Sequence, residues 1–149
     1  MYLVLPLALP FVSSLIAALL PTHARRTGAW LAGLTAVTCL VLVLAQTPGI
    51  IEHGVLKYQL PWIPTMGVEL TLRMDGYAWL FGVIITAMGA LIALYAHYYL
   101  SDQDPVPRFF SFLLIFMGAM LGVVLSGNLI QLVVFWELTS LTSFMLIAY

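Results

Sequence analysis

Residues 109–149, FFSFLLIFMGAMLGVVLSGNLIQLVVFWELTSLTSFMLIAY, are a long apolar stretch that holds a single charged side chain, Glu137. At ~1.5 Å per residue, one helix of that length would be about twice as long as the ~30 Å hydrocarbon core of a bilayer is thick. The stretch must therefore turn. Residues 126–128 (SGN) have the chemistry of a turn. We predict two membrane-spanning helices here, over residues 109–126 and 128–149.

The composition of the whole chain agrees with a membrane protein. Apolar residues of the set AVILMFWYC make up 63% of the 149 residues, and charged residues 7%, where about 25% charged is typical of a soluble domain. So few charges cannot cover a water-facing surface, which excludes a soluble enzyme and a disordered tail. No basic run is present to hold a nucleic acid.

The lone Cys39 cannot form an internal disulfide, and we expect it to be a small buried hydrophobe.

The same length rule gives three earlier spans, over residues 2–20, 27–46 and 76–100. Pro6 and Pro10 interrupt the first span, so neighbouring groups must satisfy the carbonyls that these prolines leave free. Asp75 precedes the third span, where its carboxylate can cap the free N–H groups of the first turn. We therefore predict an all-α polytopic membrane protein with five transmembrane helices.

The polar segment between the second and third spans has the pattern of a β-hairpin. Residues 68–75 (VELTLRMD) alternate between apolar and polar side chains, and residues 56–60 (LKYQL) do the same over a shorter run. Residues 61–67 (PWIPTMG) between them favour a turn. We predict a hairpin over residues 54–75 that lies on the membrane surface. Arg73 and Asp75, two apart on a strand, point the same way and predict a surface ion pair.

The basic residues predict how the chain is oriented. The first and third links hold Arg25, Arg26 and Arg108, whereas the hairpin segment holds Lys57 and Arg73. The positive-inside rule then places the hairpin and the N-terminus outside the cell, and the end of the chain inside.

Glu137 is the only Asp, Glu, Lys or Arg within the five predicted spans. It follows Asn128 by nine positions, ~14 Å along a helix, and so lies near the bilayer midplane. An ionised acid there costs on the order of 2.5–3.5 kcal/mol, which a cation, water or protonation must offset. An acid inside the membrane is a candidate for ion translocation. The alternative is a structural hydrogen bond or an ion pair between helices.

The residues around Glu137 indicate how its helix packs. At ~100° per residue, Ser140 falls on the Glu137 side, whereas Asn128, Thr139, Thr142 and Ser143 fall on the opposite side. Small hydroxyl residues mark close helix packing in membranes. We therefore expect protein on both sides of this helix, with the acid facing an internal polar pathway and Gln131 making a packing hydrogen bond.

Three residues are weaker candidates that would support Glu137: Ser140, Thr139 and His97. His97 lies among tyrosines at the end of the third span, where it serves either as part of an interfacial aromatic belt or in proton entry. The sequence has no metal-ligand cluster and no cofactor motif. We expect neither a metal nor a cofactor.

Several motifs resemble one family of transporters. Residues 134–144 (VFWELTSLTSF) resemble the fifth-helix signature of the large A subunit of Mrp-type multisubunit Na⁺/H⁺ antiporters. Residues 73–76 (RMDG) and 95–99 (YAHYY) resemble a third-helix region that this protein shares with subunit 5 of respiratory complex I. The match continues through residues 108–110, 120–124 and 128–129. Complex I subunit 5 usually has Trp-Glu-Gly where this chain has Trp-Glu-Leu, which favours the antiporter.

The resemblance implies a role for Glu137 as the fifth-helix glutamate of the ion-translocation path, paired with a lysine from a later helix. Lys57, the only lysine here, falls in the hairpin, and the large subunits of this family are several times longer. We therefore expect residues 1–149 to be the N-terminal portion of a larger subunit whose remainder supplies membrane lysines.

The function that the resemblance implies is Na⁺ export in exchange for H⁺, within a multisubunit antiporter complex of the bacterial inner membrane. One alternative is the proton-pumping module of a complex I-like NADH:quinone oxidoreductase or of a membrane-bound hydrogenase. Another is a scaffold subunit that transports nothing, for which Glu137 is only a packing contact.

Overall fold

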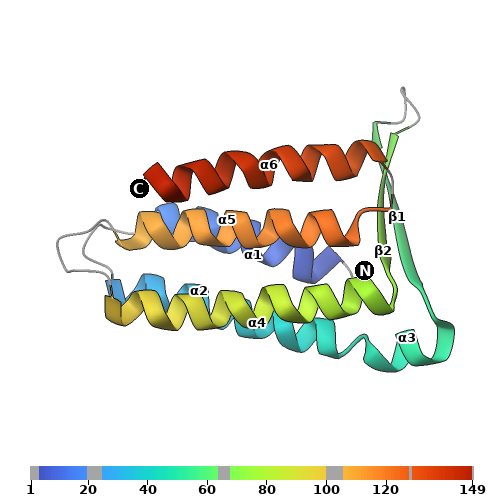
Figure 1. The fold of residues 1–149 in the computed structure, drawn as a ribbon, viewed down its shortest axis with the longest axis horizontal. Helices are drawn as coiled ribbons and strands as arrows, with labels where there is room; N and C mark the ends of the chain where they lie inside the picture. Colours follow the sequence, from blue (N-terminus) through green and yellow to red (C-terminus); the bar gives the residue numbers. More distant parts are fainter. Residues whose placement is uncertain (1–3, 20–24, 64–67, 100–105, 128, 149) are drawn as a thin grey trace.

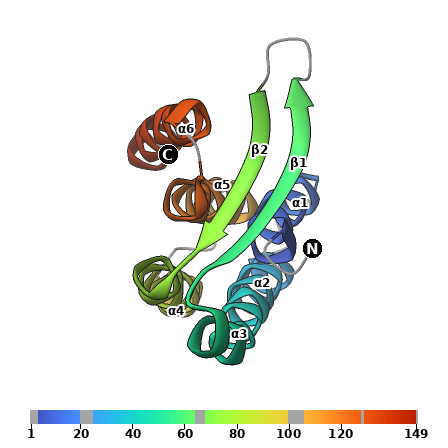
Figure 2. The same ribbon diagram turned by 90° about the vertical axis from the view of Figure 1, so that its right-hand side faces the viewer.

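The computed structural model describes residues 4–19, 25–63, 68–99, 106–127 and 129–148. Five long helices lie side by side, and a two-stranded sheet crosses one end of the bundle (Figures 1 and 2). The chain begins at the hairpin end and finishes at the opposite end (Figure 1). The order of elements is α1 (Val4–Ala18), α2 (Arg25–Leu44), α3 (Thr47–His53), β1 (Leu56–Ile63), β2 (Val68–Met74), α4 (Gly76–Tyr99), α5 (Val106–Leu125) and α6 (Leu129–Ala148).

Four of these helices, α2, α4, α5 and α6, belong to segments long and apolar enough to cross a membrane, which confirms the membrane fold. The first helix, α1, has 15 residues, ~22 Å by the standard rise, which is shorter than the ~30 Å hydrocarbon core. Residues 2, 3 and 20 of the predicted first span lie outside the described residues. The fifth membrane span therefore stays a prediction.

Helix α5 begins three residues earlier than predicted because a proline is accommodated in its first turn. The sequence predicts a polar link around Pro107, yet the helix starts at Val106. The first N–H groups of a helix have no intrahelical acceptor, so a proline there removes no hydrogen bond. Helix α2 likewise starts at Arg25 rather than at residue 27, and ends at Leu44 rather than at residue 46.

The short helix α3 was not predicted from the sequence. Pro48 lies in its first turn, and Gly54 ends it with a positive φ of 79°. The Gly54 N–H donates to the carbonyl oxygen of Ile50 at 2.7 Å. A helix of seven residues is too short to give a clear apolar period. Its start and its end therefore depend on proline and glycine geometry.

The predicted hairpin is confirmed in the antiparallel pairing of β1 with β2, in a register that pairs Leu56 with Met74. Strand β1 continues to Ile63, past the predicted end at residue 60, with an irregular register between Pro61 and Ile63. Proline has no N–H to donate to a partner strand, and irregularities are common at such positions. Along β2, Leu72 and Met74 are buried and Arg73 between them is exposed. The predicted turn residues 64–67 lie outside the described residues.

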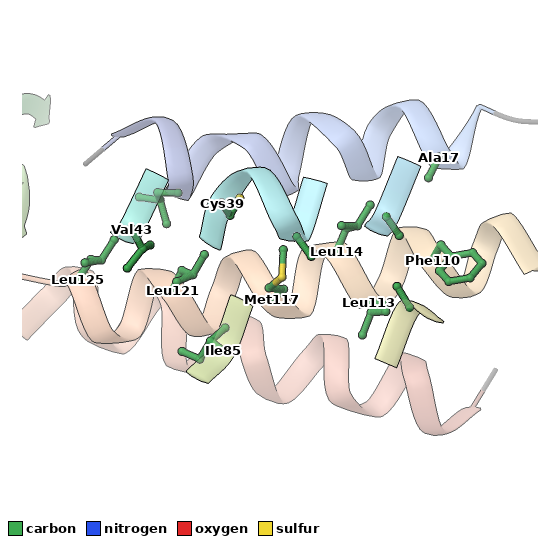
Figure 3. Close-up of a cluster of buried hydrophobic side chains, with 14 of the residues drawn as sticks. Ala17, Cys39, Val43, Ile85, Phe110, Leu113, Leu114, Met117, Leu121 and Leu125 are labelled. Atoms are coloured by element: carbon green, nitrogen blue, oxygen red, sulfur yellow. The ribbon is translucent and has the colours of Figure 1, made fainter. Parts of the chain in front are cut away.

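Helix α5 is the centre of the bundle, because it packs against α1, α2, α4 and α6. Its buried side chains Leu114, Met117 and Leu121 pack toward α2, which contributes Cys39 and Val43 (Figure 3). The predicted burial of Cys39 is confirmed. With α5 inside, α6 is left at the edge of the bundle (Figures 1 and 2).

Candidate functional site

Glu137 lies in the middle of α6, on the face of that helix that points away from α5. The side chain is exposed, as are those of Val133, Val134, Ser140 and Leu141 on the same side. No hydrogen bond or ion pair joins the side chain of Glu137 to another residue in the part of the chain that the structure describes. The acid thus lies on an open face of the bundle.

The opposite face of α6 packs against α5, as the pattern of hydroxyl residues predicts. Thr142 is 2% exposed, and its hydroxyl donates to the carbonyl oxygen of Leu138 at 2.8 Å. Thr139 and Ser143 are half-buried, while Asn128 lies outside the described residues. The Phe135 ring takes the space that a side chain at Gly122 would need. The packing of the hydroxyl side on α5 is confirmed. The protein and the internal polar pathway expected on the Glu137 side do not come from the described residues, so that part stays a prediction.

The open face is apolar apart from Glu137 and Ser140. Trp136 is 60% exposed, Phe144 67% and Ile147 84%. Such a surface suits a membrane or a protein partner, whereas a carboxylate placed against lipid tails costs on the order of 2.5–3.5 kcal/mol. An apolar face and a carboxylate on that same face are compatible in a membrane only where protein or water covers the carboxylate. The groups that cover Glu137 must therefore lie outside the described residues.

The turn between α5 and α6 is bound to the hairpin. The N–H of Thr71 donates to the side-chain oxygen of Gln131 at 2.8 Å, and the N–H of Gly127 donates to the Thr71 carbonyl oxygen at 2.8 Å. Leu72 and Ser126 form an isolated β-bridge beside them. The packing hydrogen bond expected of Gln131 is confirmed, with a partner 60 positions away along the chain.

His97 lies in the last turn of α4 and is half-buried. Its ring meets Tyr98 edge-on, with 4.9 Å between the ring centroids. It lines a groove of about 500 Å³ between α2 and α4, together with apolar residues such as Trp30 and Leu34. Helix α5 lies between α4 and α6 (Figure 2), so the described structure does not bring His97 to Glu137. These surroundings suit an interfacial aromatic group, and a role in proton entry stays a prediction.

Of the three supporting candidates, Ser140 alone shares the open face with Glu137. The hydroxyl of Thr139 donates to the carbonyl oxygen of Trp136, within its own helix. Within the described ranges, no three His, Cys, Asp or Glu side chains gather where they could hold a metal ion. The candidate site is therefore Glu137 with Ser140, on one face of one helix.

Asp75 caps α4 as predicted. Its carboxylate accepts the N–H of Ala78 at 2.9 Å and pairs with the Arg73 guanidinium at 3.2 Å. The hydrogen bond from Ala78, and then the positive charge of Arg73, hold the pKa of Asp75 below its ordinary value. The Arg73 side chain is 46% exposed. This is the predicted surface ion pair, and it is a structural feature at the hairpin end of the bundle.

Comparison with known proteins finds antiporter subunits. Residues 62–110 match the family model described as "NADH-Ubiquinone oxidoreductase (complex I), chain 5 N-terminus".

One relative, from Rhizobium meliloti (strain 1021), is named as the A/B subunit of a probable K(+)/H(+) antiporter. It is 55% identical over 140 residues, which are 94% of this chain and 14% of the relative. The A subunit of the Na(+)/H(+) antiporter of Alkalihalophilus pseudofirmus is 42% identical over 147 residues, 94% of this chain and 18% of that relative. The chain thus spans less than a fifth of the length of these curated relatives.

Two solved structures share the fold. One chain of the Mrp complex from Dietzia sp. DQ12-45-1b matches with a TM-score of 0.79 and 30% identity, over 97% of this chain and 15% of that one. One chain of the membrane-bound sulfane sulfur reductase, an archaeal respiratory membrane complex, matches with a TM-score of 0.80 over 97% of this chain and 22% of that one. At 22% identity, the second match shows the fold alone.

Proposed function

We propose that this chain, a homologue of the N-terminal portion of the large A subunit of Mrp-type antiporters, is the first part of a protein that exchanges a monovalent cation for protons. The cation that we propose is Na⁺, exported as H⁺ enters. One relative carries Na⁺/H⁺ in its name and another K⁺/H⁺, so a transport assay must compare the two cations. The proposed location is the bacterial inner membrane, with the hairpin and the N-terminus outside the cell.

The observation that carries this proposal is the position of Glu137. It is an acid in the middle of an apolar spanning helix, on a face that no described residue covers. We infer that later parts of the full-length protein, together with its partner subunits, cover that face and supply the lysines that the described spans lack. Such a cover would remove the cost of exposing a carboxylate to lipid.

The proposed chemistry at Glu137 is reversible proton binding. A nearby ammonium group stabilises the ionised carboxylate, and when the ammonium moves away the carboxyl binds a proton instead. Alternation between these two states passes protons along the membrane path. Ser140, on the same side of α6, is placed to hydrogen-bond water beside the acid. Its role is to support the transfer, because its hydroxyl does not change charge.

Substitution of Glu137→Gln in the assembled complex tests the proposal. Inverted membrane vesicles are given a proton gradient, and the collapse of the gradient is recorded after addition of Na⁺ or of K⁺. We expect exchange to fall at least about a hundredfold, because a group that transfers protons contributes about 10²–10⁴-fold. Glu52→Gln is the matched control, since Glu52 is an exposed acid on α3. Undiminished exchange in Glu137→Gln would contradict the proposal.

Assembly of the complex separates transport from scaffolding. If Glu137 is only a packing contact, Glu137→Ala should lower the yield of intact complex. If Glu137 carries ions, the complex should assemble normally and lose exchange. Native gel electrophoresis of the solubilised complex measures the first quantity, and the vesicle assay measures the second.

A second candidate function is the proton-pumping module of a complex I-like enzyme. The observation that favours it is the match of residues 62–110 to the N-terminus of complex I chain 5. The purified complex separates the two functions. Exchange driven by cations in the absence of any redox substrate supports the antiporter, whereas proton pumping that requires quinone reduction supports the enzyme.

A further inference from the structure

Gln131 is the polar side chain that connects α6 to the hairpin. It is fully buried in the first turn of that helix. Its side-chain oxygen accepts the Thr71 N–H at 2.8 Å, and the Thr71 carbonyl oxygen accepts the Gly127 N–H at the same distance. Both polar groups of the Thr71 backbone are therefore held by the α5–α6 segment. The hairpin and the start of α6 form one hydrogen-bonded unit.

Gln131 and Glu137 project from the same helix at a fixed angle to each other. Gln131 precedes Glu137 by six residues, which is ~9 Å along the helix axis and ~120° around it. The two side chains therefore point in different directions, Gln131 into the bundle and Glu137 away from it. Any rotation of the helix that moves Gln131 away from Thr71 also turns the carboxyl of Glu137.

The other contacts of α6 determine its rotation less sharply. This helix packs on α5 along one side, through apolar and small side chains such as Phe135. Apolar contacts are non-directional, so they tolerate small rotations better than a hydrogen bond does. Thr142 is buried on the same side, but its hydroxyl donates to carbonyl oxygens of its own helix. It therefore places no restraint on rotation relative to the hairpin.

We propose that Gln131 is a positioning residue for Glu137: by binding the Thr71 N–H, it sets the rotation of α6 relative to the hairpin and so the direction of the carboxyl. This inference rests on the proposed function of Glu137. At a helix radius of ~5–6 Å, a rotation of about 10° moves a side-chain end by about 1 Å. A misplacement of that size is enough to slow a transfer that depends on geometry.

The test compares two substitutions in the intact complex. Gln131→Met keeps the size of the side chain and removes the acceptor oxygen. Thr142→Val is the matched control, because it removes an equally buried polar group that bonds only within its own helix. Hydrogen–deuterium exchange at the Thr71 amide measures the hydrogen bond itself. The vesicle assay, repeated across a pH series, measures the rate of cation/proton exchange and its pH midpoint.

We expect the Thr71 amide of Gln131→Met to exchange at least about tenfold faster, since it loses its acceptor. We also expect Gln131→Met to slow cation/proton exchange and to shift its pH midpoint. In Thr142→Val, the rate of cation/proton exchange and its pH midpoint should keep their wild-type values. Gln131→Glu keeps an acceptor oxygen and should restore the protection of the Thr71 amide. If Gln131→Met does not assemble, Gln131→Asn, which is one methylene too short to reach, replaces it.

Two results would overturn the proposal. Unchanged exchange of the Thr71 amide in Gln131→Met would mean that the hydrogen bond restrains nothing. Faster hydrogen–deuterium exchange of the Thr71 amide, with an unaltered rate and pH midpoint of cation/proton exchange, would mean that Gln131 anchors the hairpin without orienting the acid. Neither result touches Glu137 itself, whose proposed role fails only if Glu137→Gln transports normally.

Discussion

The Sγ atom of Cys39 on α2 lies 3.6 Å from the carbonyl oxygen of Pro6 on α1, to which the thiol donates a hydrogen bond. In a regular helix, that carbonyl accepts the N–H of the residue four positions later. Here that residue is Pro10, which has no N–H. A thiol from the neighbouring helix therefore takes the place of the missing donor.

Removal of this thiol should destabilise the protein only while Pro10 is present. We expect Cys39→Ala to lower the free energy of unfolding by about 1 kcal/mol, since the Pro6 carbonyl loses a donor inside the bundle. Cys39→Ser keeps a donor and should lose less. In a Pro10→Ala background the backbone supplies its own N–H, so the same Cys39→Ala change should cost little. Unfolding curves of the four-variant cycle measure the coupling, and equal costs in both backgrounds would rule it out.

Helix α6 should be sensitive to any side chain added at Gly122. A Cβ there would overlap the Phe135 ring near its attachment point, where the ring cannot move aside easily. We expect Gly122→Ala to destabilise the packing of α6 on α5 by about 1–3 kcal/mol, as overpacking does in other cores. Thermal denaturation of the solubilised complex measures the loss. Gly33→Ala is the control, because nothing lies within 4 Å of a Cβ at that position, and a similar loss there would point to a general effect of the methyl group.

The cap of α4 should make stability depend on pH in the acid range. The hydrogen bond from Ala78, with the charge of Arg73, lowers the pKa of Asp75 from its ordinary value of 3.8. Since the folded pKa is the lower one, the stabilisation is present above the unfolded value and is lost as the pH falls through the folded pKa. We expect Asp75→Ala to cost about 1 kcal/mol at neutral pH and progressively less in acid. Asp75→Asn, which keeps a capping oxygen, should cost less throughout, and a pH-independent deficit in Asp75→Ala would refute the linkage.

The orientation predicted from the basic residues can be tested by labelling. Lys57 on β1 and Arg108 on α5 are both exposed and belong to segments that the positive-inside rule assigns to opposite sides of the membrane. We expect Lys57→Cys to react with an impermeant maleimide in intact cells, and Arg108→Cys to react only in inverted vesicles. The native Cys39 is buried, so the wild-type chain serves as the blank. The reverse pattern would invert the proposed topology.

The parts of the fold that were predicted correctly are those with a strong local signal. Alternation along residues 68–75 predicted a strand, and Leu72 and Met74 are buried as that pattern requires. The period of α6 placed Thr142 and Glu137 on opposite sides before any neighbour was known. Helix α3 escaped prediction because two turns give no clear period. The start of α5 was misplaced because Pro107 suits a link and a first helical turn equally well.

The order of residues along the chain is enough to predict a membrane protein, the positions of its long apolar segments, and one acid near the middle of the last segment. These are local properties, since segment length and the cost of a charge in lipid do not depend on which helices are neighbours. Three relationships follow from the folded arrangement alone: Cys39 contacts the carbonyl of Pro6, Gln131 contacts Thr71, and α5 separates His97 from Glu137. Such pairings depend on how whole helices rotate and pack against one another, and no short stretch of residues encodes that arrangement.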